Sequence, residues 1–411
     1  MLFNGSNMIT NGPSDQPVII LSINYRLGVF ADLYIEELVN EDPEWPTAGN
    51  YMYLDMLSAL RWIKTNIRDY GGDPNNIAIF GQSAGGLSVT DLGAIRGSSG
   101  LYHTALSQSG LSSPGTYTSY YNVSDAMTYS YKVVQRLNCT DDDKQKVLQC
   151  LRNSSIENIL NAYEGRYTRP IIDNHFFPLY PPLAIQSGNY NNISLIMGNN
   201  DYEQQICSKQ PDMNSTVAMS TLISLVGSQW SLVAADYYHL NNCSSDRNSN
   251  KTRCCEILRM ITMDKIFDCD IQRILNSFYS KSSPQFLSDR LFSYHLNCYP
   301  TCPPVPNKDT CEHTSELPFV FGTVSDVNSK GPINCTWDDQ TRTFSNRIIA
   351  HWINAASTGK PLPSWPNYNP MTPKFLQITP GQDFYSVPWN RNCSFFDQIE
   401  ADGVRQTFGK I

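Results

Sequence analysis

A serine flanked by glycines is the residue of this chain best suited to chemistry. The segment Gly81-Gln82-Ser83-Ala84-Gly85-Gly86 follows an apolar, strand-like run at 77–80 and precedes a helix-compatible run at 87–92. A strand, a sharp turn and a helix are the context of a nucleophile elbow, where glycines two positions either side leave room for the turn. The helix would direct free N–H groups, beginning with Ala84, at negative charge on a reacting oxygen. The alternative is a glycine-rich turn without chemistry.

Six histidines compete as the base that would activate this serine. A serine hydroxyl is a poor nucleophile until a histidine takes its proton, and a carboxylate must orient that histidine. The candidates are His103, His175, His239, His295, His313 and His351. His351 shares a helical spacing with Ile348 and Ala355, which favours a packed helix residue. His103 follows the serine closely, at the start of a predicted strand. Chemistry alone does not choose among the others.

Composition sets limits on the class of protein. The chain has 411 residues, of which 41% are apolar and 17% charged, which is typical of a globular protein with a substantial core. Its 30 basic and 38 acidic residues give a net charge of −8, which argues against nucleic acid as a partner. No run of 18 apolar residues exists, so the sequence predicts no membrane span.

Cysteines and glycosylation sequons indicate the secretory pathway. The chain has twelve cysteines and ten N-x-[ST] sequons, at Asn4, Asn122, Asn138, Asn153, Asn192, Asn214, Asn242, Asn250, Asn334 and Asn392. Residues 1–7 have neither the basic nor the apolar region of a signal peptide, so we expect the natural start to lie upstream. Cys298, Cys302 and Cys311 invite a metal interpretation, but disulfides are favoured in this company. We expect the adjacent Cys254 and Cys255 to bond different partners.

The apolar patterns predict strands alternating with helices. Expected strands lie at 18–23, 77–80, 103–107, 193–197 and 375–378, and expected helices at 53–69, 127–137, 267–278 and 344–355. Residues 214–300 look mainly helical, and the Pro- and Cys-rich residues 300–312 are expected to form a loop. Such alternation favours an α/β fold with a mostly parallel sheet. We see no linker, so we expect residues 1–411 to form a single domain.

Several segments together resemble the type-B carboxylesterase and cholinesterase family of α/β-hydrolases. They are Ser22-Ile23-Asn24-Tyr25-Arg26-Leu27-Gly28-Val29-Phe30, Gly49-Asn50-Tyr51 with Asp55, Gly71-Gly72-Asp73-Pro74, the elbow at 81–86, and Gln108-Ser109-Gly110. The resemblance implies an α/β-hydrolase fold, with a mostly parallel central sheet flanked by helices. It also implies a short disulfide loop closed by Cys139 and Cys150. A bridge there is worth about 3 kcal/mol in a chain-entropy model.

The resemblance also selects the partners of Ser83. His313 precedes Glu316-Leu317-Pro318-Phe319-Val320-Phe321-Gly322, which is similar to the segment after the family's catalytic histidine. The family's acid follows a strand-ending glycine by five residues, which indicates Glu203 after Gly198. The chain departs from the family pattern in having Gln204 after this acid, and Asp201 is the alternative. The resemblance further implies that Ser109 and Glu316 brace the acid.

Two departures from the family pattern affect the expected function. Gln82 stands where cholinesterases carry a glutamate that helps to hold a cationic substrate, and the family's choline-stacking tryptophan would lie upstream of Met1. We therefore expect a general esterase rather than a choline-ester specialist. The family's His-Gly-Gly oxyanion segment is also absent upstream of Asn24-Tyr25-Arg26. We therefore expect the chain to be N-terminally truncated, without the strand that the family places between 18–23 and 77–80.

These observations predict hydrolysis of a small-molecule carboxylic ester through a Ser83 acyl-enzyme. His313 would act as general base and then acid, Glu203 would orient it, and the Ala84 N–H would contribute to the oxyanion hole. No cofactor and no metal are implied. One alternative is a catalytically impaired or non-catalytic adhesion or scaffold protein, since one lost oxyanion donor costs on the order of 10²–10³ in rate. The sequence does not separate a lipid-acting hydrolase from a short-chain esterase.

Overall fold

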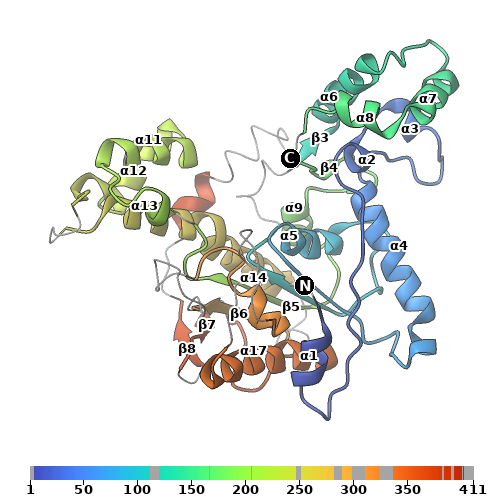
Figure 1. Cartoon of the computed structure of the whole chain (residues 1–411). Coiled ribbons are helices and arrows are strands. Elements are labelled where there is room, and N and C mark those ends of the chain that lie inside the picture. The colour runs from blue at the N-terminus through green and yellow to red at the C-terminus, as the bar shows by residue number, and fades with distance from the viewer. Residues whose placement is uncertain are drawn as a thin grey trace.

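A six-stranded sheet forms the centre of the computed structural model of this protein (Figure 1). The structure describes residues 4–401 except 112–119, 166, 205, 247–250, 282–288, 299–310, 324–336, 382–383, 390–392 and 400. The strands lie in the order β1 (Ala78–Gln82), β2 (Thr104–Gln108), β5 (Ser194–Asn200), β6 (Leu291–Leu296), β7 (Lys374–Ile378) and β8 (Tyr385–Pro388). Every neighbouring pair is parallel except β7 and β8. The expected mostly parallel sheet is therefore confirmed.

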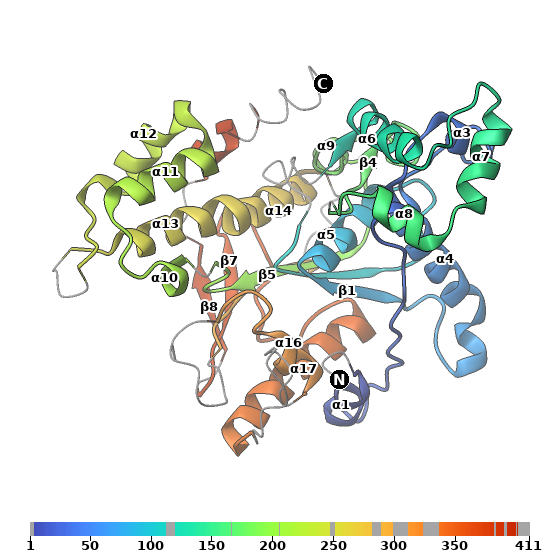
Figure 2. The same cartoon turned by 45° about the horizontal axis from the view of Figure 1, so that its top comes forward.

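Helices bury both faces of this sheet (Figure 2). Ala105 and Leu195 belong to one apolar cluster, together with helices α4 (Tyr51–Asn66) and α14 (Cys269–Lys281). The next residues along the same strands, Leu106 and Ile196, belong to a second cluster, together with α16 (Leu317–Phe321) and α17 (Asp339–Thr358). Successive side chains of a strand point to opposite faces, so the central strands must be apolar on both. This explains their continuous apolar sequences.

Further helices gather at two ends of the sheet. One group contains α2 (Val29–Asp32), α3 (Glu36–Val39), α6 (Val123–Arg136), α7 (Lys144–Asn153) and α8 (Ile156–Ala162), beside the short strands β3 (Tyr121–Asn122) and β4 (Ile171–Ile172). The other contains α10 (Ile206–Lys209), α11 (Ser215–Val226), α12 (Ser228–Tyr237) and α13 (Cys254–Met263) (Figure 2). Other α-helices are α1 (Ser6–Asn11), α5 (Ala84–Asp91) and α9 (Pro181–Ser187). Among the described residues, no helix combines the length and apolarity needed to span a bilayer.

The expected strand at 18–23 is wrong. This segment has no strand pairing, and Ile19, Leu21 and Ile23 are 44%, 44% and 40% exposed. Val18 and Ile20 pack against the same apolar cluster as Phe80 of β1, which is the terminal strand of the sheet. A β-strand needs a hydrogen-bonded neighbour, and within the described residues no strand lies between this segment and β1. An apolar sequence alone therefore does not make 18–23 a strand.

The expectation of a mainly helical region at 214–300 missed β6. All six residues of β6 are buried, and the strand pairs with β5 and β7. Ser293 and His295 interrupt the apolar run, so the local pattern does not resemble a buried strand. The loop expected at 300–312 falls largely on residues 299–310, which lie outside the described residues.

Five disulfides connect described cysteines. They are Cys139–Cys150, Cys207–Cys255, Cys243–Cys254, Cys269–Cys393 and Cys298–Cys311. The first is the bridge implied by the family resemblance, and Cys254 and Cys255 do bond different partners. Cys298 and Cys311 are joined to each other, so their thiolates are not available as metal ligands. Cys302 lies outside the described residues.

We expect the double variant Cys139→Ala/Cys150→Ala to have a free energy of unfolding about 3 kcal/mol lower than that of the parent chain. The bridge closes a loop with a sequence separation of 11, and its loss restores conformational entropy to the unfolded chain. Urea unfolding followed by circular dichroism measures the difference. Asp142→Ala, an exposed change inside the same loop, is the control and should leave the midpoint unchanged. A double variant as stable as the parent chain would contradict this account.

Candidate active site

Ser83 occupies a strained turn between β1 and α5. Its φ of 56° and ψ of −120° lie in a region that non-glycine residues rarely adopt. The backbone holds it there on two sides. The Ser83 N–H donates to the Gln108 carbonyl at 2.8 Å, and the Leu87 N–H donates to the Ser83 carbonyl at 2.9 Å. The turn therefore presents the serine at the end of β1, directly before the helix.

Glycines at three positions allow this close backbone approach. A Cβ at Gly81 would lie 2.5 Å from the carbonyl carbon of Gly85, and one at Gly86 would lie 2.9 Å from the Gly110 carbonyl oxygen. A Cβ at Gly110 would overlap the Ser83 carbonyl oxygen. At Gly85, by contrast, a Cβ would meet nothing within 4 Å, so crowding does not require a glycine there, contrary to the expectation. Gly86 and Gly110 supply the clearance instead.

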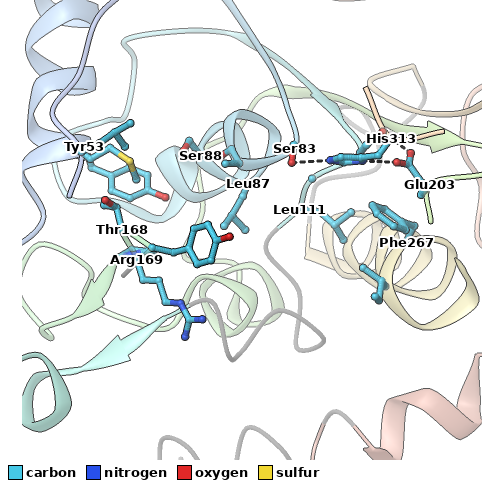
Figure 3. A pocket seen from close by; sticks show the side chains of 18 of the residues that line it. Tyr53, Ser83, Leu87, Ser88, Leu111, Thr168, Arg169, Glu203, Phe267 and His313 are labelled. Atoms are coloured by element: carbon cyan, nitrogen blue, oxygen red, sulfur yellow. Dashed lines mark hydrogen bonds and ion pairs between the residues drawn. The ribbon is translucent and has the colours of Figure 1, made fainter. Parts of the chain in front are cut away.

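Three side chains from distant parts of the chain meet at this turn (Figure 3). The His313 Nε2 lies 2.8 Å from the Ser83 Oγ, and its Nδ1 lies 2.5 Å from the Glu203 Oε2. Glu203 follows β5 and His313 precedes α16, and a bridge between Tyr202 and Glu312 aligns the two segments. A hydroxyl, an imidazole and a carboxylate in this order can transfer a proton away from the hydroxyl.

The alternative acid, Asp201, faces a different part of the structure. Its Oδ2 accepts a hydrogen bond from the Gln377 Nε2 at 3.3 Å. Its pKa is raised, chiefly by burial. Among the described contacts of His313, the carboxylate partner is that of Glu203.

Buried donors surround the Glu203 carboxylate, which is 2% exposed. The Ser109 Oγ and the Asn200 N–H both donate to its Oε1 at 2.5 Å. The side-chain amide of Asn200 donates from its Nδ2 to the Glu316 Oε2 at 2.6 Å. Glu316 is therefore linked to Glu203 through Asn200 rather than by a direct hydrogen bond. Sequence reasoning named Ser109 and Glu316 but missed Asn200. Its position at the end of β5 was the available signal.

Burial and neighbouring charge shift the pKa values of two groups here. Burial lowers the pKa of His313, but the hydrogen bond and charge of Glu203 and the charge of Glu316 raise it above the usual value. Burial, together with the Glu203 charge, raises the pKa of Glu316 to about 7. Two buried acids thus lie close to a half-buried base, and their negative charges favour protonation of the imidazole.

The Ala84 N–H is the first free donor of α5, directly after Ser83. Donors at a helix N-terminus favour negative charge, and this one neighbours the serine oxygen. Gln82 lies on the other side of the serine, and its Nε2 is 3.4 Å from the His313 Nε2. The neutral amide of Gln82 therefore contacts the imidazole, whereas a glutamate at this position would add a negative charge beside it.

A π-helical turn, Asp264–Asp268, forms the wall beside the histidine. It places Ile266 and Phe267 on the lining of the cavity, and the Phe267 and His313 rings are 6.5 Å apart. The turn also contacts the sheet, because the Asp268 carboxylate lies 3.0 Å from the Nε2 of His295 on β6. Such turns are rare inside helices and concentrate at functional sites. Sequence reasoning predicted a helix here but not the extra residue that turns Phe267 inward.

The site opens into a cavity of about 680 Å³. Apolar and aromatic side chains form much of its lining, including Leu87, Leu111 and Phe267. Among the described residues, the one group with metal-ligand geometry is Cys207, Cys255 and Glu256, which contains a disulfide. Volume and lining are those of a site for a small organic molecule.

The profile of the Carboxylesterase family matches residues 1–396. The chain therefore belongs to the carboxylesterase family, and its α/β-hydrolase fold agrees with that membership. A solved structure of PNB esterase superimposes with a TM-score of 0.70 at 24% identity, covering 97% of this chain and 77% of that one. The expected family and fold class are thus confirmed.

Curated relatives include enzymes and neuroligins. Carboxylesterase 5A of Canis lupus familiaris is 27% identical over 396 residues, covering 90% of this chain and 62% of that protein. Neuroligin-2 of Mus musculus is 24% identical over 406 residues, covering 95% of this chain and 45% of its own length. The chain thus spans between about half and two thirds of these relatives.

The glycine contacts predict opposite effects for two alanine substitutions four residues apart. We expect Gly81→Ala to lower the free energy of unfolding by about 2–4 kcal/mol, since its Cβ would clash with backbone that cannot move aside. Gly85→Ala is the matched control. It lies in α5 with open space around it, so helix propensity should leave stability unchanged or raise it by up to about 1 kcal/mol. Urea unfolding measures both, and equal destabilisation would contradict the proposed crowding.

Proposed function

We propose that this protein hydrolyses small carboxylic esters through an acyl-enzyme on Ser83. The observation that carries the proposal is the continuous contact from the Ser83 Oγ through His313 to the buried Glu203. Membership of the carboxylesterase family supports the same reaction class. No residue of the proposed mechanism requires a cofactor.

In the proposed first step, the Ser83 Oγ attacks the ester carbonyl carbon while its proton passes to the His313 Nε2. Glu203 accepts the Nδ1 hydrogen bond and stabilises the resulting imidazolium. The carbonyl oxygen becomes an oxyanion, which the Ala84 N–H stabilises. As the tetrahedral intermediate collapses, its bond to the alcohol oxygen breaks, and His313 gives that oxygen the proton. The acyl group remains on Ser83.

In the second step, water repeats the sequence. His313 takes a proton from the water, the hydroxide attacks the acyl carbon, and the imidazolium returns the proton to the Ser83 Oγ. The products are the carboxylic acid and a restored serine. Ser109 and Asn200 act only through Glu203, whose orientation they fix, and Glu316 acts through Asn200. These are therefore positioning residues.

We further propose that this protein is a general esterase rather than a choline-ester specialist. Gln82 contributes no negative charge beside the serine, and the lining carboxylate of Glu203 is already bonded to Ser109, Asn200 and His313. A quaternary ammonium group binds most favourably where aromatic faces and negative charge surround it. The described lining offers it no free carboxylate.

A non-catalytic role is the second candidate, and the similarity to neuroligin-2 is the observation that favours it. Among the described residues, Ala84 is the oxyanion donor that we assign, and a single donor predicts slow turnover. The esterase remains preferred because a scaffold needs no aligned serine, imidazole and carboxylate, whereas this chain keeps all three in contact.

We also propose a single domain, exported through the secretory pathway. The family match over residues 1–396 supports one domain. Five disulfides support an oxidising compartment. Of the seven described sequon asparagines, six are exposed and Asn122 is half-buried, so glycans at the six would meet no core.

The decisive test is hydrolysis of 4-nitrophenyl acetate by the parent chain and by Ser83→Ala. We expect the substitution to lower kcat by at least about 10³, because it removes the attacking oxygen. The control is Ser220→Ala on the exposed face of α11, which should leave kcat unchanged. Equal rates in the parent and Ser83→Ala chains would overturn the mechanism, and inactivity of a folded parent chain would favour the scaffold role.

The pKa of His313 predicts the pH dependence of the reaction. The base must be neutral, so kcat/KM should rise with pH through an apparent pKa above the ordinary histidine value of about 6.5. In Glu203→Gln the hydrogen bond and charge of Glu203 no longer raise the pKa of His313, while burial still lowers it, so the rise of kcat/KM should move to lower pH. The rate should fall by about 10⁴ because the imidazole loses its orienting carboxylate. A rise that stays at the same pH would contradict the role of Glu203.

A further inference from the structure

Among the residues that the structure describes, two cationic side chains line the cavity that contains Ser83. They are Arg169, which lies two residues before β4, and Lys209, which ends α10. Figure 3 shows Thr168 and Arg169 toward one end of the cavity and His313, Glu203 and Phe267 toward the other, with Ser83 nearer the latter. Arg169 is thus set apart from the reacting hydroxyl along the same cavity.

Arg169 makes no ion pair within the part of the chain that the structure describes. Its contact there is with the ring of Tyr121, whose centroid lies 5.2 Å from the guanidinium carbon. An aromatic face supports a guanidinium group without neutralising it. The carboxylate that lines the described cavity, Glu203, is committed to Ser109, Asn200 and His313. The Arg169 charge is therefore not balanced from within the described lining.

The rest of the molecule makes this charge unusual. The chain carries a net charge of −8, so its overall field repels anions, and a cationic cavity wall is not a by-product of composition. Arg169 is half-buried, whereas Lys209 is exposed and more strongly screened by water. A guanidinium also stays charged at every physiological pH and binds carboxylates through two parallel hydrogen bonds. Of the two cations, Arg169 is therefore the better anion-binding group.

We infer that Arg169 selects esters that carry a second, free carboxylate, such as half-esters of dicarboxylic acids. This inference rests on the proposed function, because the ester carbonyl must lie at Ser83 while the carboxylate contacts Arg169. Leu87, which lies between Ser83 and Arg169 in Figure 3, adds an apolar side chain to the lining that suits a methylene chain. Arg169 touches the substrate but not the reacting atoms, so it governs specificity and not the chemical step.

The test compares two substrates of equal length, monoethyl adipate and ethyl hexanoate, which differ by a terminal carboxylate. Ester cleavage by the full chain is followed by pH-stat titration. We expect Arg169→Gln to lower kcat/KM for monoethyl adipate about 10- to 100-fold, as for loss of a charge-assisted hydrogen bond. The value for ethyl hexanoate should stay unchanged, and Arg169→Lys should recover part of the loss. Added salt should weaken hydrolysis of the anionic ester alone.

Two further variants serve as controls. Arg342→Gln removes an exposed arginine on α17, which is paired with Asp339, and should affect neither substrate. Lys209→Gln should affect monoethyl adipate less than Arg169→Gln does. The inference is overturned if Arg169→Gln lowers both substrates equally, if it lowers neither, or if Lys209→Gln alone removes the preference.

A binding measurement separates this inference from the proposed function. Ligand-observed NMR compares adipic acid monoamide, which is an unreactive analogue, with hexanamide. We expect the parent chain to bind the monoamide more tightly and Arg169→Gln to lose that difference. Binding with this pattern but without ester cleavage would leave Arg169 assigned and overturn the proposed reaction. Cleavage without any preference for the carboxylate would leave the reaction and overturn the assignment of Arg169.

Discussion

The buried negative charge of Glu203 is the constraint on which the site depends. A carboxylate removed from water must be matched by donors, since an unpaired buried charge costs several kcal/mol. Its donors come from three places: Ser109 just after β2, Asn200 at the end of β5, and His313 before α16. These segments coincide only when β2 and β5 pair in register, with Gln108 opposite Gly198. Satisfying one charge therefore fixes the sheet, the histidine loop and the serine together.

Local sequence was sufficient for the features that local chemistry determines. The elbow at Ser83, the central strands β1, β2 and β5, and the amphipathic helices were predictable because each is encoded within a few neighbouring residues. The family resemblance placed Glu203 and His313 as well, which residue chemistry alone left undecided. The structure brings both of them to Ser83, and their catalytic roles remain proposals.

Features that depend on distant partners escaped prediction. Residues 18–23 have the composition of a strand but, within the described part of the chain, no strand to pair with, whereas β6 has a mixed composition and two neighbours. The sequence predicted steric crowding at Gly85, but the crowded positions are Gly86 and Gly110. The hexapeptide does not reveal that the segment after β2 packs against it. Asn200 and the π-turn that directs Phe267 likewise take their meaning from contacts across the fold.

The backbone contact between Ser83 and Gly110 separates two kinds of information in this sequence. Gly110 is required by the Ser83 carbonyl and Gly81 by the backbone of Gly85, so neither glycine depends on the serine hydroxyl. A descendant that lost the hydroxyl would face the same steric demand at both positions. Its glycines would continue to record the shape of the turn long after the chemistry had gone. In comparisons among descendants, the three side chains at 83, 203 and 313 are therefore the ones that distinguish an enzyme from a descendant that has lost its activity.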